Sequence, residues 1–164
     1  MMDGTDAALA IRAGRPDDYP AALEVQRRAY AEKEAPLYGK DIPPLRETPD
    51  SLAAEIAEGK TLVLGEIDGT IVASVRMKTL GGGAVYFGRL SVDPAFQGRG
   101  IGQRMALAVE ELNPGAHEFI LDCGIDSLEN LHIYHKLGYR ETGSTIQVQD
   151  GPKCVEMTKT RKRI

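Results

Sequence analysis

The sequence predicts an α/β fold in which a mixed, mostly antiparallel sheet of about seven strands is flanked by four helices. Three observations lead to this prediction. Hydrophobic periodicity gives the segment order β-α-α-β-β-β-α-β-α-β-β. Asp68-Gly69 joins two strand-like segments as a two-residue hairpin turn. A glycine-rich turn at 97–102 leads from a strand into a helix, and the strand that follows this helix becomes a parallel neighbour.

Length and composition are those of an ordinary globular protein. The chain has 164 residues, of which 42% are hydrophobic and 27% charged. This predicts a single domain over residues 1–164, with residues 1–7 disordered. The net charge of −4 does not favour nucleic-acid binding. No apolar stretch approaches the roughly 18 residues that a membrane span requires, so we expect no membrane association and a cytoplasmic location.

The first third of the chain is expected to hold one strand and two helices. Residues 9–13 form the strand, and a helix over 18–31 follows, with Asp17 as its cap. The segment 36–49 contains four of the nine prolines and is predicted to be a long binding loop. Thr48 and Ser51 then cap a helix that ends at Gly59.

The remaining elements alternate between strands and helices. Asn113-Pro114-Gly115 ends the helix that begins near Gly100, and Gly138 ends a helix that begins at Asp126 or Ser127. The two cysteines, Cys123 and Cys154, have no metal-type spacing and are expected to be reduced and buried. Strands are predicted over residues 61–67, 70–77, 85–92, 119–123, 139–143 and 154–158.

The turn from Gln97 to Gly102 is a candidate anion site. Glycines at 98, 100 and 102 let the backbone approach a ligand closely, and the free N–H groups at a helix start attract negative charge. Arg99 adds a charged contact. The turn fits neither the P-loop nor the dinucleotide-binding spacing. It is therefore either a plain connection or the seat of a pyrophosphate whose long tail runs back along the preceding strand.

Three features together resemble the GNAT family of N-acetyltransferases. The first is Leu90-Ser91-Val92-Asp93-Pro94 followed by Gln97-Gly98-Arg99-Gly100-Ile101-Gly102, which is similar to the family's acetyl-CoA signature. The second is Tyr134-His135-Lys136-Leu137-Gly138-Tyr139, which is similar to its Y-x-x-x-G-F/Y motif. The third is the order of elements from Leu9 to Thr158.

The resemblance implies that acetyl-CoA binds across the middle of the sheet. Its pantetheine arm would pair with the backbone of Leu90 and Val92, and its pyrophosphate would lie on the turn. Where family members commonly carry asparagine, this chain has Ser127, and Asn130 stands where a small residue is usual. The implied cofactor-binding residues are Leu90, Ser91, Val92, Gln97, Gly98, Arg99, Gly100, Ile101, Gly102, Ser127, Asn130 and Tyr134.

Acetyl transfer to an amine needs a neutral nucleophile, stabilisation of an oxyanion and a proton for the departing thiolate. The family match makes Tyr134 the general acid, and the N–H of Val92 can hold the oxyanion. The strand positions that often carry a base are here Tyr86 and Gly88, neither of which is an ordinary base. Asp122 is the best remaining carboxylate, but a strand-end aspartate that hydrogen-bonds the backbone or caps the next helix is the favoured reading of this position. A water-mediated base is equally compatible with the sequence.

The acceptor is expected to be a primary amine on a small molecule or a protein, and the sequence does not identify it. His132 and His135 have no third ligand at metal-binding spacing, so no metal is expected. The chain is expected to be a monomer or homodimer. The alternatives are a non-catalytic acyl-CoA-binding or regulatory module and a binder of other phosphates. Candidate acceptor residues are Tyr30, Tyr38, Tyr86 and Arg89, with Arg46 and Glu47 beside them.

Overall fold

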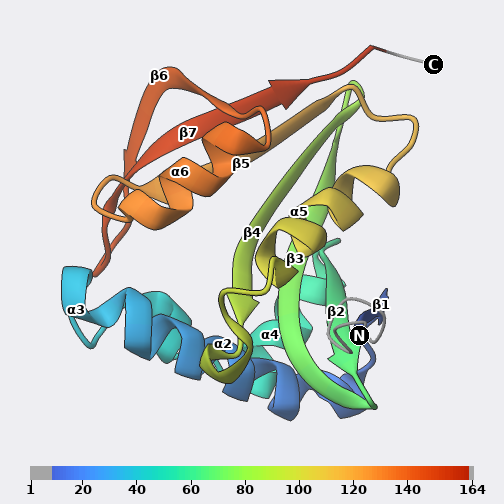
Figure 1. Ribbon diagram of the computed structural model, residues 1–164, viewed down its shortest axis with the longest axis vertical. Coiled ribbons are helices and arrows are strands. Elements are labelled where there is room, and N and C mark those ends of the chain that lie inside the picture. The colour runs from blue at the N-terminus through green and yellow to red at the C-terminus, as the bar shows by residue number, and fades with distance from the viewer. Residues whose placement is uncertain (1–8, 163–164) are drawn as a thin grey trace.

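The computed structural model describes residues 9–162, which form one seven-stranded sheet with helices on both faces (Figure 1). The strand order is β1-β2-β3-β4-β5-β7-β6, and every neighbouring pair is antiparallel except β4 and β5. The predicted disorder of residues 1–7 lies outside the described residues. The strands are β1 (Leu9–Ala13), β2 (Thr61–Ile67), β3 (Thr70–Gly81), β4 (Ala84–Val92), β5 (Glu118–Gly124), β6 (Arg140–Gln147) and β7 (Lys153–Thr160).

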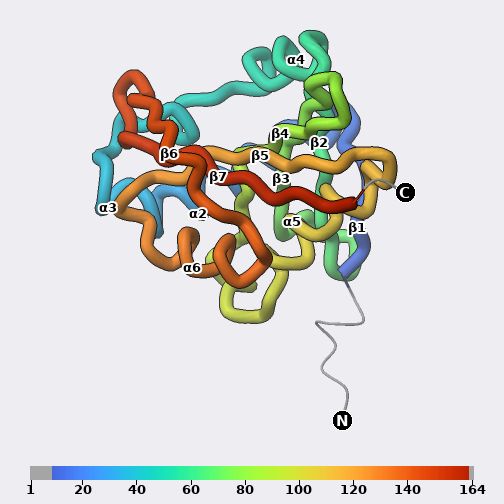
Figure 2. The backbone as a smooth tube through the Cα atoms, turned by 90° about the horizontal axis from the view of Figure 1, so that it is seen from above, coloured from blue at the N-terminus to red at the C-terminus, as the bar shows by residue number. Residues whose placement is uncertain are grey.

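The helices divide the core into two clusters. On one face, α5 and α6 cover the larger cluster, which contains Met105, Phe87 and Phe119. On the other face, α2 and α4 pack on β2 through a smaller cluster that includes Leu52 and Leu64. Figure 2 shows the sheet between α4 on one side and α5 and α6 on the other. The helices are α2 (Tyr19–Lys33), α3 (Ala35–Tyr38), α4 (Pro49–Ala57), α5 (Ile101–Glu111) and α6 (Leu128–Lys136), with short 3-10 turns η1 (Pro16–Asp18), η2 (Pro43–Leu45) and η3 (Pro94–Phe96).

The start of α2 differs from the prediction. Asp17 does not cap the helix, because the chain forms η1 at this point and α2 begins only at Tyr19. The neighbouring Asp18 has the structural role instead. Its carboxylate accepts a hydrogen bond from the Arg15 N–H at 2.8 Å and forms an ion pair with Arg12 at 2.8 Å. Asp18 thus stands at the N-cap position of α2, but its side chain makes no cap hydrogen bond to the helix.

The segment 36–49 is more ordered than predicted, since α3 and η2 interrupt it. The predicted cap of α4 by Thr48 and Ser51 is confirmed. The Ser51 N–H donates to Thr48 Oγ1 at 3.1 Å, and the Thr48 N–H donates to Ser51 Oγ at 2.9 Å. The Asp68-Gly69 turn is also confirmed, with positive φ at both residues, 51° and 79°, as a tight hairpin requires.

The parallel contact between β4 and β5 is short. Only Ala84–Tyr86 pairs with Glu118–Ile120, and beyond these residues the two strands separate (Figure 1). On the other side, β4 has an irregular register with β3 between Gly88 and Ser91. Arg89 lies within this bulge at φ 54°, a left-handed conformation that costs a non-glycine residue about 1–2 kcal/mol. The sheet is therefore split open at its centre.

Candidate active site

A cavity of about 1130 Å³ lies where β4 and β5 separate. Its walls come from α2, α3, β4, the start of α5, β5 and α6. Of the predicted site residues, Arg99, Arg46 and Glu47 are not among its lining residues. The Arg99 guanidinium instead lies 5.2 Å from the centre of the Phe96 ring, and Arg46 pairs with Asp150 at 3.5 Å. The lining includes Leu90, Ser91, Val92, Gln97, Gly98, Gly100, Ile101, Gly102, Ser127, Asn130, Tyr134, Asp122, Tyr30, Tyr38, Tyr86 and Arg89.

The edge of β4 that faces the gap has backbone groups available to a ligand. The Asp93 N–H donates to the Val72 carbonyl of β3 at 2.8 Å. Because backbone groups alternate along a strand, those of Leu90 and Val92 point the other way, toward the gap. The side chain of Gln97 donates to the Val92 carbonyl at 3.2 Å. Ser91 is buried, and its hydroxyl donates to the Arg89 carbonyl at 3.0 Å, so its side chain holds the bulge.

The glycine-rich turn has the conformation that the sequence predicts. Gly98 and Gly100 have φ values of 79° and 76°, and Gly100 is the N-cap of α5. A Cβ at either position would meet no atom within 4 Å, so glycine is needed here for its backbone conformation rather than for space. The first N–H groups of α5 have no partner within the helix and lie at the cavity wall, an arrangement that suits a phosphate.

Tyr134 projects from α6 into the wall of the cavity. Its ring makes edge contacts with Phe87 and Tyr139, with centroid distances of 6.5 and 6.0 Å. Its hydroxyl donates no hydrogen bond to any of the described residues. Burial raises the pKa of Tyr134 well above its usual value of 10. The hydroxyl is thus held protonated and available to a ligand.

Asp122 lies on the cavity side of β5, between the buried Leu121 and Cys123. The Tyr86 hydroxyl of β4 donates to its Oδ2 at 3.0 Å. Burial raises the pKa of Asp122, and the Tyr86 hydrogen bond partly opposes this rise. The two strands thus hold a hydroxyl and a proton-accepting carboxylate together just beyond the point at which their ladder ends.

A polar chain that the sequence did not reveal joins α2 to α6. The Tyr38 hydroxyl accepts from the Asp126 N–H at 3.0 Å and lies 2.8 Å from Ser127 Oγ, which donates to Glu34 at 2.9 Å. Asn130 also donates to Glu34, at 3.1 Å. Burial raises the pKa of Glu34. The side chains of Ser127 and Asn130 therefore contact the end of α2, and their predicted contact with a cofactor remains a prediction.

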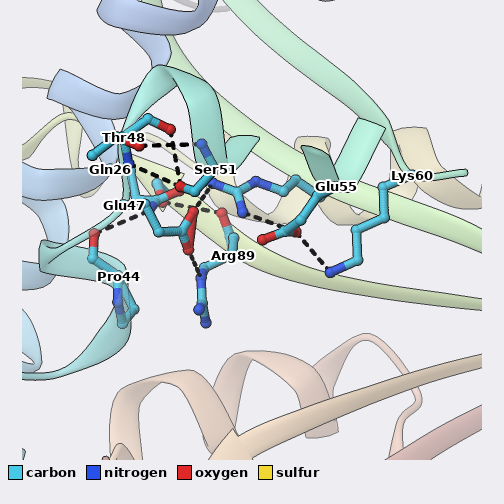
Figure 3. A network of polar contacts seen from close by, with 10 residues as sticks. Gln26, Pro44, Glu47, Thr48, Ser51, Glu55, Lys60 and Arg89 are labelled. Carbon is cyan, nitrogen blue, oxygen red and sulfur yellow. Dashed lines mark hydrogen bonds and ion pairs between the residues drawn. The ribbon is translucent and has the colours of Figure 1, made fainter. Parts of the chain in front are cut away.

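A second cluster joins the predicted residues Glu47 and Arg89 to Arg76, Glu55 and Gln26, which sequence reasoning missed (Figure 3). The buried Arg76 pairs with Glu47 at 2.5 Å and Glu55 at 3.2 Å, and it donates to Gln26 at 2.8 Å. Glu47 also pairs with Arg89 at 2.7 Å. Arg76 stands in a strand that the sequence predicts. Only the tertiary structure shows that Glu55 of α4 and Glu47 of the preceding loop contact its side chain.

The other chemistry-bearing side chains in the described part of the chain give no further site. Cys123 and Cys154 are free and buried, and burial raises their pKa values to about 12 and about 11. His135 contacts Glu141 at 2.6 Å. Within residues 9–162 no group of three His, Cys, Asp or Glu side chains is arranged to hold a metal ion. None of the helices in this part of the chain is long and apolar enough to cross a membrane.

Comparison with solved structures identifies the fold. PaiA N-acetyltransferase from Thermoplasma acidophilum, solved with coenzyme A, is 20% identical, with a TM-score of 0.79 over 94% of this chain and 99% of the other. The ribosomal-protein-S18-alanine N-acetyltransferase of Escherichia coli is 17% identical, with a TM-score of 0.75 over 93% of each chain. Salmonella typhimurium yncA, a putative acetyltransferase solved with acetyl-CoA, is 16% identical, with a TM-score of 0.67 over 93% of each chain. These likenesses confirm the predicted GNAT-like fold.

The sequence itself matches a family model. The model describes an acetyltransferase (GNAT) domain and matches residues 28–161, from within α2 to the end of β7. No curated protein sequence gives a significant match. The matched region contains the split between β4 and β5, the glycine-rich turn and Tyr134. The chain therefore belongs to the GNAT family of acetyltransferases.

Proposed function

We propose that the protein transfers an acetyl group from acetyl-CoA to a primary amine bound in the cavity between β4 and β5. The observation that carries this proposal is the continuity of one cavity from the free edge of β4 and the start of α5 to Asp122 and Tyr134. Such a shape suits a ligand with a long neutral arm and a diphosphate. It also leaves room for an acceptor beside the reacting end.

The donor site is built from backbone groups. Acetyl-CoA supplies the thioester. Leu90 would pair with its pantetheine arm, the N–H groups from Gln97 to Gly102 would hold its pyrophosphate, and the N–H of Val92 would stabilise negative charge on the thioester oxygen. Open space at Gly98 and Gly100 fits this assignment, since a diphosphate needs close approach to the backbone.

Two side chains are assigned to the proton transfers. The amine nitrogen forms a bond to the acetyl carbon as the carbon–sulfur bond breaks. Asp122, directly or through water, takes the proton that the amine loses. Tyr134 donates its hydroxyl proton to the departing sulfur, and the raised pKa keeps that proton on the hydroxyl until the carbon–sulfur bond breaks.

The test is incubation of the protein with acetyl-CoA and a panel of small amines and peptides while free thiol is followed. Amine-dependent release of thiol is expected. Tight binding of CoA without release over any acceptor would favour a non-catalytic acyl-CoA-binding module. Stabilisation by other nucleotides but not by CoA would favour a different phosphate binder. Both alternatives make use of the same glycine-rich turn.

A further inference from the structure

The geometry points to the acceptor class: we propose that Arg89 binds a carboxylate of the acceptor, so that the substrate is a free amino acid. The inference rests on the proposed acetyl transfer and concerns the same cavity. It assigns to Arg89 the recognition of the end of the acceptor that does not react, which neither the family nor the similar structures decide.

The Arg89 guanidinium is only partly used by the protein. Its Nε pairs with Glu47 Oε1 at 2.7 Å, which is the one ion pair that the described residues form with it. Its side chain keeps 33% of its accessible surface and lines the cavity. In Figure 3 its terminal nitrogens point out of the network formed by Glu47, Glu55 and Lys60. A planar fork of this kind matches a carboxylate in a two-point contact.

The charge of the cluster around Arg89 is not balanced. Three cations, Lys60, Arg76 and Arg89, share two carboxylates, Glu47 and Glu55. Contacts with Arg89 and Arg76 hold the pKa of Glu47 below its usual range although burial opposes this, so that Glu47 stays ionised. Counted by direct ion pairs among the described residues, the cluster is one carboxylate short of its cations, and a ligand anion would supply the missing charge.

The position of Arg89 relative to Asp122 restricts the class of ligand further. The Tyr86 hydroxyl donates to Asp122, and the positive charge of Arg89 acts on the same hydroxyl, partly opposing the rise in pKa that burial causes. A cation and a carboxylate thus flank one tyrosine in the cavity wall. These groups suit the two ends of a small molecule that carries both a carboxylate and an amine.

The backbone at Arg89 supports a role in binding. Its φ of 54° is a strained conformation for a residue with a side chain, and Ser91 fixes the bulge through its hydrogen bond to the Arg89 carbonyl. A glycine would relieve that strain. Strained residues of this kind cluster at ligand sites, where the surrounding structure holds them in place.

The experiment compares amines that differ only in the carboxylate. Free thiol is followed with acetyl-CoA and each of the common L-amino acids, paired with the carboxamide of the same amino acid. Removal of the carboxylate lowers the pKa of the amine, so chemical reactivity alone favours the carboxamide. We expect the reverse for the best acceptor, with kcat/KM about tenfold to a hundredfold higher for the amino acid, the range for loss of a charge-assisted contact.

Variants then assign the preference to Arg89. Arg89→Gln is expected to raise KM for the amino acid by about tenfold to a hundredfold and to leave kcat/KM for the carboxamide within about threefold. Arg89→Lys keeps the charge and should retain part of the preference, whether or not the glutamine variant folds well. Arg27→Gln, which removes an exposed arginine paired with Glu24 outside the cavity, should behave as the unaltered protein.

Equal use of amino acids and carboxamides, or an equal loss of both in Arg89→Gln, would overturn the assignment. If no amine releases thiol, the proposed function fails instead, and the anion site is then decided by calorimetric titration of amino acids into the CoA-saturated protein. Binding that Arg89→Gln abolishes supports the carboxylate site. Absence of binding to the unaltered protein refutes it.

Discussion

At the scale of single residues, burial acts on Tyr134 and Asp122 in the same chemical direction, because it favours the neutral form of each. Burial raises the pKa of both groups. For the tyrosine this preserves a proton that can be donated at any ordinary pH. For the aspartate it strengthens the carboxylate as a base. The same burial thus acts on the proposed acid and on the proposed base, which serve two separate proton transfers.

Tyr134→Phe tests the acid. Loss of the hydroxyl is expected to lower kcat about a hundredfold, the lower end of the usual contribution of general acid catalysis. The dissociation constant of CoA should change little, because the ring contacts with Phe87 and Tyr139 are kept. Steady-state thiol release and calorimetry measure the two quantities. Tyr19→Phe alters a buried tyrosine in the other core cluster and serves as the control. An unchanged kcat would remove Tyr134 from this role.

Asp122→Asn should separate stability from activity. A carboxyl with a raised pKa binds its proton more tightly in the folded chain, so stability falls as the pH rises from the unfolded pKa of about 4 through the folded one. The asparagine variant is therefore expected to have a higher Tm at pH 7, and this gain should vanish at pH 3.

Turnover of the same variant should fall about a hundredfold if Asp122 is the base. A more stable but less active variant is the usual sign of a functional carboxylate. Full activity at pH 7 would instead identify Asp122 as a structural partner of Tyr86.

Sequence reasoning found the motif residues but missed their neighbours. Tyr134 and the glycine turn have local signatures, and Asp122 stands in a readable strand. Glu34 and Arg76 have no local signature, because each depends on a partner distant in the sequence. Ser127 is 93 residues from Glu34, and Glu47 is 29 residues from Arg76. Contacts of that range depend on how the helices pack, and one sequence does not contain that information in a local form.

At the scale of elements, the start of α5 is expected to contribute most to the binding of CoA. Gly100→Asp and Gly100→Asn are a matched pair, since both side chains tolerate left-handed φ and both can cap a helix. No atom lies within 4 Å of the added Cβ. Both variants should keep a Tm near that of the unaltered protein.

Only the charge should distinguish the two variants in binding. The aspartate is expected to weaken CoA binding more than tenfold relative to the asparagine, because it places a carboxylate beside the pyrophosphate site. Isothermal titration with CoA at low and high salt measures the difference, which should shrink as salt screens the repulsion. Equal affinities would place the pyrophosphate elsewhere.

The prediction of elements was most accurate where turns and caps have their own chemistry. Strand β1 and the hairpin at Asp68-Gly69 were predicted with correct bounds, as was the Thr48 cap. The α2 cap was wrong because η1 precedes the helix, and Asp18 at the N-cap position bonds to Arg12 and Arg15 and not to the helix. Inside 36–49 the prolines suggested a loop, but proline also suits the first turn of a short helix, as in α3 and η2.

At the scale of the whole molecule, Arg76 connects the layers. It reaches from β3 to Gln26 of α2 and to Glu55 of α4, and it pairs with Glu47. Arg76→Met is expected to lower the free energy of unfolding by about 1–3 kcal/mol, because it removes the buried contacts with Gln26 and Glu47 while Lys60 and Arg89 still pair with the two carboxylates. Equilibrium unfolding in urea measures this change in the free energy of unfolding. Arg27→Gln, at an exposed pair, should cost less than about 1 kcal/mol. A similar small loss for Arg76→Met would mean that solvent reaches the network.

The short ladder between β4 and β5 has a mechanical consequence. Within residues 9–162, three paired positions form the hydrogen-bonded seam between the half-sheet β1–β4 and the half-sheet β5–β7. Amides that face the split, those of Leu90 and Val92, should exchange with deuterium rapidly in the free protein and slowly once CoA lies against them. Bound acetyl-CoA would then hold the two half-sheets together. Catalysis would occur only in a molecule that its own substrate has made more rigid.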